Sequence, residues 1–212
     1  MWSWLAVALS CLLFIFAGEK GDKARMVVFS GLTHILLAVI LIKTGMFEPY
    51  QMWILVGLAL FTISDGVVQW RRFTKLSFFG YIAAQLAYSW AMWGQVNSEF
   101  VLWLPALLFC IAIVTFLLLL PRLDSFLMPV ALMGLSLVHL MCAAGEAWLI
   151  TRSFEAMIGF AGAACLALSA LLLALDKYHF QSKRASYAVS GSYYLAHSLI
   201  VASALSSSTQ MI

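Results

Sequence analysis

The sequence predicts an all-α integral membrane protein, a bundle of about eight transmembrane helices. Hydrophobic residues make up 64% of its 212 positions and charged residues 10%, with a mean hydropathy of +1.00. A soluble domain is about 45–50% apolar and about 25% charged. Apolar stretches long enough to cross a bilayer core recur along the whole chain. The composition therefore excludes a soluble cytosolic enzyme, a disordered chain and a nucleic-acid-binding protein.

Each predicted helix is an apolar stretch that ends at polar or charged residues. The stretches cover residues 1–17, 26–43, 51–70, 76–94, 101–120, 128–151, 156–176 and 187–206. None shows strand-like alternation, and helices satisfy their own backbone hydrogen bonds in lipid. Because these stretches use most of the chain, we expect residues 1–212 to form a single polytopic membrane domain.

The first stretch has no basic segment before it, and Lys20, Lys23 and Arg25 follow it. This pattern is typical of a first span with its N-terminus outside, not of a signal peptide. Basic residues also follow the third, fifth and seventh stretches: Arg71, Arg72, Lys75, Arg122, Lys177, Lys183 and Arg184. Only Lys43 and Arg152 fall on the opposite side. The positive-inside rule therefore predicts that both termini are non-cytoplasmic, and we expect the bacterial inner membrane.

The third and seventh stretches share a short pattern that suggests two parallel four-helix repeats. Gly57 and Ser64 match Gly162 and Ser169 at one common offset, and basic loops follow both helices. An even number of helices per repeat preserves orientation, and repeats of this kind are common in membrane folds. The match is short, so unrelated halves are an equal alternative.

Two acidic residues lie inside predicted spans. Asp65 lies five residues before Trp70, about 8 Å inside the cytoplasmic boundary. A carboxylate at mid-helix costs about 2.5–3.5 kcal/mol on insertion scales, so such a residue faces the bundle interior or a water-filled cavity. A structural hydrogen bond to a neighbouring helix is the alternative. Glu146 lies nearer the external face, where an interfacial carboxylate would also reach water.

Histidines and hydroxyl-bearing residues accompany these acids. His34, His139 and His197 lie within predicted spans, and Tyr194 shares a helical face with His197. Gln85 and Tyr88 form a similar pair. Asp65 with the three histidines could supply zinc ligands, but neither HExxH nor a close His pair is present, and the four cysteines lack CxxC spacing. We therefore expect no metal and no cofactor.

Four segments give the sequence a recognisable family pattern. They are 57–66 (GLALFTISDG), 134–148 with Ala-Gly-Glu-x-Trp at its end, 162–169 with its small residues, and 193–201 (YYLAHSLIV). Along nearly its whole length the chain resembles the YhhN family of lysoplasmalogenase-like membrane proteins, with Asp65, Glu146 and His197 at matching positions. It departs from the family pattern at Ser30, where Lys-Pro is usual, at Gln85 for His, and at Ala170 for Asp or Asn.

The resemblance implies hydrolysis of the vinyl ether bond of lysoplasmalogens, which yields a fatty aldehyde and a glycerophospho-head group. Such a bond is cleaved by protonating its β-carbon, after which water adds to the oxocarbenium ion. Removal from water disfavours a charged carboxylate, so Asp65 is a candidate acid, and His197 or Glu146 would position the water. Substrate-binding candidates are Tyr194, Gln85, Ser64, His139 and His34.

The expected partner is a lysophospholipid or another single-tailed lipid, met within the bilayer. Two alternatives stay open. The altered residues Ser30, Gln85 and Ala170 suit a relative that binds or shuttles a lipid without cleaving it. Intramembrane acids also form proton relays in transporters, although Gly/Pro interruptions at mid-span are few. The sequence leaves the oligomeric state and the head-group preference open.

Overall fold

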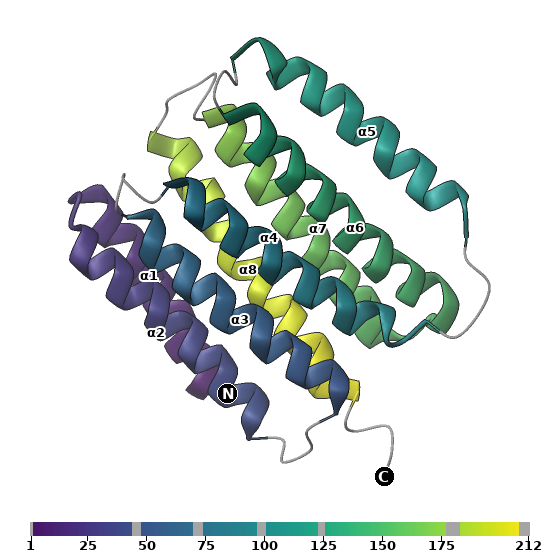
Figure 1. Ribbon diagram of the computed structural model, residues 1–212. Helices are drawn as coiled ribbons and strands as arrows, with labels where there is room; N and C mark the ends of the chain where they lie inside the picture. The colour runs from purple at the N-terminus through teal and green to yellow at the C-terminus, as the bar shows by residue number, and fades with distance from the viewer. Residues whose placement is uncertain are drawn as a thin grey trace.

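The computed structural model describes residues 2–43, 48–69, 74–96, 101–122, 126–176 and 183–207. Within these residues the chain forms eight α-helices, one short 3₁₀ helix and no strand (Figure 1). The α-helices are α1 (Trp2–Glu19), α2 (Lys23–Ile42), α3 (Pro49–Val68), α4 (Thr74–Trp93), α5 (Trp103–Leu119), α6 (Leu127–Thr151), α7 (Phe154–Leu175) and α8 (Lys183–Ser207). The predicted all-helical membrane fold is confirmed.

Six of these helices have both the length and the hydropathy of a membrane span. The exceptions are α5, which is apolar but only 17 residues long, and α4, which carries the buried polar residues Ser77, Gln85 and Ser89. About 17 residues is the lower limit for a span, so α5 still meets it. A helix with buried polar positions crosses the membrane only inside a bundle, where neighbours cover them.

Two helix starts differ from the predicted boundaries for an identifiable reason. Helix α2 begins at Lys23 because the Asp22 side chain accepts a hydrogen bond from the Arg25 backbone N–H at 3.1 Å. Helix α7 begins at Phe154 because the Ser153 side chain accepts from the Ala156 N–H, also at 3.1 Å. Such N-caps satisfy donors that the first helical turn otherwise leaves unpaired.

Neighbouring helices pack in an order that recurs after four helices. Helix α1 packs on α2, α2 on α3 and α3 on α4, and the second half repeats this sequence from α5 to α8. The two halves contact each other where α4 packs on α6 and where α8 packs on α2, a pair of contacts that is again related by a shift of four helices. Helices α1 and α5 lie at opposite margins of the bundle (Figure 1).

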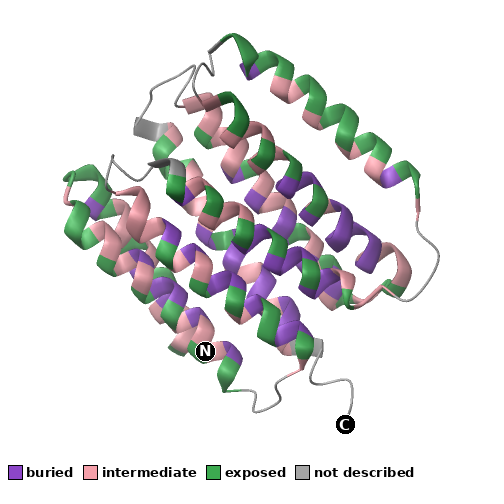
Figure 2. Cartoon of the chain, viewed as in Figure 1, coloured by how far each residue is buried: buried purple, intermediate pink, exposed green. Residues whose placement is uncertain are grey.

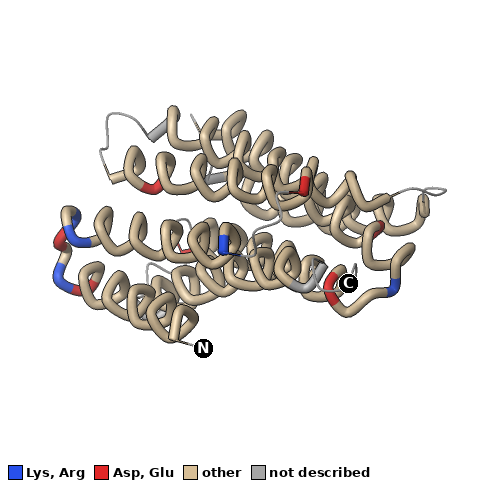
Figure 3. Tube along the Cα trace, turned by 90° about the horizontal axis from the view of Figure 1, so that it is seen from below, with Lys and Arg blue, Asp and Glu red and all other residues tan. Residues whose placement is uncertain are grey.

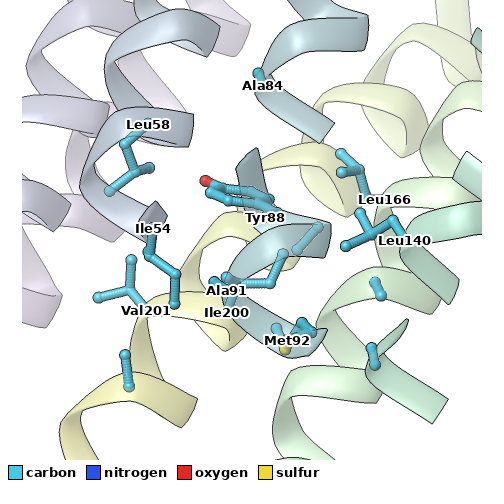
Figure 4. Packing of buried hydrophobic residues seen from close by; sticks show 14 of the residues in the cluster. Ile54, Leu58, Ala84, Tyr88, Ala91, Met92, Leu140, Leu166, Ile200 and Val201 are labelled. Carbon is cyan, nitrogen blue, oxygen red and sulfur yellow. The ribbon is translucent and has the colours of Figure 1, made fainter. Parts of the chain in front are cut away.

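Glycines bring the helices of each half close together. A Cβ atom at Gly57 in α3 would lie 2.4 Å from ring carbons of Tyr88 in α4, and one at Gly162 in α7 would lie 2.7 Å from Ile200 in α8. Small residues at such crossings let backbones approach and gain van der Waals contact. Around Tyr88 the apolar core contains Leu58, Ile200 and Leu140, contributed by three further helices (Figure 4).

The outer faces of the bundle are apolar. Exposed residues cover most of α5, whereas buried positions concentrate in the helices at the centre (Figure 2). Charged residues lie largely toward the helix ends, with long uncharged stretches between them (Figure 3). This distribution is the one that a bilayer requires. Of the basic residues used to predict the orientation, Arg71, Arg72 and Lys177 lie outside the described residues.

Candidate functional site around Asp65

Asp65 lies in the last turn of α3 and is surrounded by hydroxyl groups from three other helices. Tyr81 from α4 and Tyr193 from α8 donate hydrogen bonds to its Oδ1 atom, at 2.8 and 3.0 Å. Ser30 from α2 donates to the Oδ2 atom. Buried polar oxygens need hydrogen-bond donors, and these three hydroxyl groups supply them. Its neighbours therefore offset the cost of placing this polar side chain inside the bundle.

Two histidines extend this polar cluster into the bundle. His34 of α2 places its Nδ1 atom 3.9 Å from the Asp65 Oδ2 atom and 3.0 Å from the Ser30 carbonyl oxygen. The ring of His197 in α8 lies 4.9 Å from the His34 ring, centroid to centroid, at an angle of 69°. On its other side, the His197 Nδ1 atom lies 2.9 Å from the Tyr88 hydroxyl. Asp65, His34 and His197 thus form one continuous chain of contacts.

Three atoms of this cluster lack a hydrogen-bond partner although they are buried. They are the Nε2 atoms of His34 and His197 and the hydroxyl oxygen of Tyr194. Buried polar atoms in native proteins are nearly always satisfied, so orphaned atoms need an explanation. The Tyr194 ring lies 5.9 Å from the His34 ring, so all three orphans belong to one neighbourhood. Small polar molecules, such as water or part of a ligand, would satisfy such atoms.

Apolar rings enclose the cluster on the core side. Phe61 packs edge-on against His197 with ring centroids 4.4 Å apart, and Tyr193 does so at 4.5 Å. His34 and His197 are each at most 1% exposed, whereas the Asp65 side chain keeps 12% of its exposure. The carboxylate is therefore the part of the cluster with access to its surroundings. The low dielectric around it strengthens every electrostatic interaction it makes.

Two predicted substrate-binding residues lie outside this cluster in packing roles. Ser64 donates to the Leu60 carbonyl oxygen at 2.7 Å, and its side chain occupies the space where a Cβ atom at Gly80 would sit. Gln85 faces the other way, toward α6, where it accepts a hydrogen bond from Ser136. Both residues are buried and join α4 to a neighbouring helix.

Glu146 and His139 lie on α6 and are tied to other segments. Both carboxylate oxygens of Glu146 lie 3.2 Å from the backbone N–H of Val101, just before α5, and the residue is fully buried. The exposed His139 accepts a hydrogen bond from the Trp93 indole N–H at 3.2 Å. Of the predicted site residues, the structure therefore gathers Asp65, His34, His197 and Tyr194, while Ser64, Gln85, Glu146 and His139 make their described contacts elsewhere.

Four residues of the cluster lie outside the predicted set of site residues. Ser30 stands out in the sequence only as a departure from a family pattern and Tyr88 only as a neighbour of Gln85, while Tyr81 and Tyr193 belong to no predicted pair. The available signal is helical spacing: Tyr81 and Tyr88 are two turns apart, and Tyr193 precedes His197 by one turn, so each pair shares a face. Within the described residues, no group of three or more His, Cys, Asp or Glu side chains is arranged to hold a metal ion.

Two comparisons with known proteins point to the same family. The sequence model of the YhhN family matches residues 2–204. Proteins named uncharacterized membrane protein YhhN from Escherichia coli O6:H1, Escherichia coli O157:H7 and Shigella flexneri are each 28% identical over 206 residues, which cover 96% of this chain and 98% of theirs. No solved structure matches the chain.

Proposed function

This chain belongs to the YhhN family, and from that premise we propose that it is an intramembrane hydrolase that cleaves the vinyl ether bond of lysoplasmalogens. The proposal rests chiefly on one observation: an acid with three hydroxyl donors and two histidines with unsatisfied nitrogen atoms share one buried cluster. Buried polar atoms in a structural network are normally paired within the protein or through ordered water, so three such atoms in one cluster favour a site that holds a polar ligand.

The first chemical step needs a proton on the β-carbon of the vinyl ether. Asp65 is the candidate donor, because the His34 Nδ1 atom, 3.9 Å from its Oδ2 atom, lies beyond hydrogen-bond distance. Asp65 in its acid form gives this proton to carbon, and the carboxylate that remains faces the oxocarbenium ion. Tyr81 and Tyr193 then stabilise the carboxylate through their hydroxyl groups. Opposite charges in a low-dielectric site attract strongly, which lowers the barrier to forming the cation.

The second step needs a water molecule on the α-carbon. A Tyr88 hydroxyl that donates to the His197 Nδ1 atom leaves the proton of that ring on Nε2, which can donate to the water oxygen. The His34 Nδ1–H donates to the Ser30 carbonyl, so its Nε2 atom is an acceptor that can take a proton from the water. The resulting hemiacetal collapses to an aldehyde and the glycerophospho-alcohol. The proton released by water replaces the one that the acid supplied.

The decisive experiment is an aldehyde-release assay with purified protein and a vinyl ether lysophospholipid. We expect turnover by the wild type and at least a 100-fold loss in Asp65→Asn, since general acid catalysis contributes about 10²–10⁴-fold. The matched control is Glu48→Gln, because the Glu48 side chain makes no cap hydrogen bond and lies at the start of α3, more than four turns from Asp65. Unchanged turnover in Asp65→Asn would contradict the role of this residue.

The same preparation separates the alternative functions. Binding of the lysolipid without aldehyde release by the wild type would favour a lipid-binding relative. Proton-coupled uptake into vesicles, abolished by Asp65→Asn, would favour a transporter. Either result would replace the hydrolase proposal.

A further inference from the structure

A lateral groove lies between α1 and α8, on the side of the bundle that faces lipid. It has a volume of about 480 Å³, within the range of about 300–1,000 Å³ that ligand pockets have. One wall is formed by α1 from Trp4 to Ile15, and the other by Gly191, Leu195 and Ser198 of α8 together with Tyr194. The α1 wall extends over about 16 Å along the helix axis. The groove is therefore elongated along the helices.

The lining of the groove suits hydrocarbon. Its few polar groups include Ser198, whose hydroxyl donates to the Tyr194 carbonyl oxygen at 2.8 Å and so presents little polarity to the groove. Leu12 lines the groove and is 53% exposed, and Leu5 and Leu9 beside it are similarly exposed. An occupant can therefore move sideways from the bilayer without crossing a polar barrier.

Tyr194 joins this groove to the Asp65 cluster. Its ring lines the groove, while its buried hydroxyl is one of the three orphaned atoms beside His34 and His197. Phe14 of α1 packs edge-on against the same ring at 5.2 Å. The Tyr194 side chain thus separates the groove from the polar cluster, and because its hydroxyl is buried, an occupant reaches the cluster when this side chain moves aside.

We propose that the groove between α1 and α8 binds the single hydrocarbon chain of the substrate, with the chain directed outward toward Trp4 and the ether linkage beside Tyr194. This inference rests on the proposed function and adds the route and orientation of the lipid. A chain that leaves the bilayer for an apolar groove gains no hydrophobic free energy, because lipid is equally apolar. Selectivity for the substrate therefore comes from its polar end, which can form hydrogen bonds with the three buried atoms that lack a partner.

Charge at the other end of the helices agrees with this orientation. Beyond the last turn of α1, Lys20, Lys23 and Arg25 accompany Glu19 and Asp22. Glu19 accepts a hydrogen bond from Tyr187, and Asp22 pairs with Arg25 at 3.1 Å. Lys20 and Lys23 are exposed there. Cations at the membrane surface attract anionic phosphate, so the head group is held at the end of α1 opposite to Trp4.

The test uses photocrosslinking, which does not require turnover. The full-length protein in detergent is irradiated with an alkyl ether lysophospholipid, which resists hydrolysis, carrying a diazirine at the far end of its chain. We expect labelled peptides from the outer part of the groove, around Trp4 and Ala8. Labelling confined to another face, such as α5, or absent labelling would overturn the inference.

Gly191 provides a variant that fills the groove without disturbing the helix. A Cβ atom there would meet no atom within 4 Å, so a Phe side chain can start at this position without a clash and extend into the groove that Gly191 lines. We expect it to abolish groove labelling and to reduce aldehyde release. Gly134→Phe on α6 is the matched control, since a Cβ atom at Gly134 also meets nothing within 4 Å. Ala8→Phe repeats the test from the opposite wall. Labelling of both groove variants at the wild-type level would overturn the inference.

The two proposals fail in different ways. If the wild-type protein releases aldehyde but is labelled outside the groove, the hydrolase proposal stands and the groove proposal is wrong. If it is labelled in the groove but releases no aldehyde, the groove proposal stands and the hydrolase proposal is wrong.

Discussion

At the scale of single residues, the cluster depends on hydroxyl groups that hold one carboxylate. Asp65 receives hydrogen bonds from α2, α4 and α8, so no single helix carries the site. Hydrogen bonds to charged groups contribute about 1.5–3 kcal/mol each, more than bonds between neutral groups. Removing one hydroxyl donor therefore weakens the stabilisation of the Asp65 carboxylate but leaves the acid itself in place.

Tyr193→Phe and Tyr81→Phe test this dependence. Each variant loses one donor to the Asp65 Oδ1 atom, and we expect aldehyde release to fall by roughly 10-fold or more in each. The control is Tyr187→Phe, which removes an exposed hydroxyl bonded to Glu19 at the end of the bundle. Equal rates in all three variants would show that the hydroxyl groups do not assist the acid.

Glu146 gives a second prediction at the residue scale. Its carboxylate accepts the Val101 N–H, so its described bonds hold the segment before α5 and not the Asp65 cluster. We expect Glu146→Gln to lower the thermal unfolding temperature in detergent while aldehyde release per folded molecule changes little. A large loss of turnover with unchanged stability would instead assign Glu146 to catalysis.

At the scale of helices, close crossings set how far each polar side chain reaches. Gly57 lets α3 approach α4 near Tyr88, the residue that contacts His197. Gly162 does the same for α7 and α8, where the nearest atoms include the Ile200 backbone nitrogen at 3.0 Å. A backbone atom cannot move aside as a flexible side chain can. The crossing at Gly162 therefore tolerates a larger residue less well than the crossing at Gly57.

Gly162→Ala is therefore expected to destabilise the protein. Overpacking of this kind costs about 1–3 kcal/mol, which a thermal unfolding curve in detergent would show as a drop of several degrees. Gly134→Ala, with open space around its Cβ position, is the control. It should be neutral or more stable, because Ala is favoured over Gly in helices by about 1 kcal/mol.

At the scale of the whole molecule, the bundle consists of two halves whose helices pack in the same order. The halves differ chemically at corresponding positions, since Asp65 in α3 corresponds to Ala170 in α7 at the offset that relates Ser64 to Ser169. The acidic cluster accordingly forms in one half, with α8 supplying Tyr193 and His197 from the other.

The orientation of this bundle in the membrane is a prediction of the charge pattern. We expect a cysteine at Arg152 to react with a membrane-impermeant maleimide in intact cells whose outer membrane is permeable. A cysteine at Lys23 should react only after the inner membrane is opened. Both positions are exposed, and the background is a chain in which Cys11, Cys110, Cys142 and Cys165 are replaced by alanine. The reverse labelling pattern would invert the topology.

The sequence by itself determined the helical membrane fold, the approximate spans and the polar residues that lie inside them. It could do so because an apolar run of this length has one low-energy solution in a bilayer, the helix. Asp65, His34, His197 and Tyr194 were identifiable on the same ground, since polar groups in lipid are costly.

Only the tertiary structure decided which of these groups meet. Helical spacing fixes the face that a residue shares with its own neighbours, but not the rotation of that helix against the next one. That rotation follows from side-chain packing at crossings such as Gly57 on Tyr88. Packing brought Ser30, Tyr81 and Tyr193 onto Asp65 and turned Gln85 toward Ser136. The reason is physical: packing complementarity is a property of pairs of surfaces, and a single helix contains only one of them.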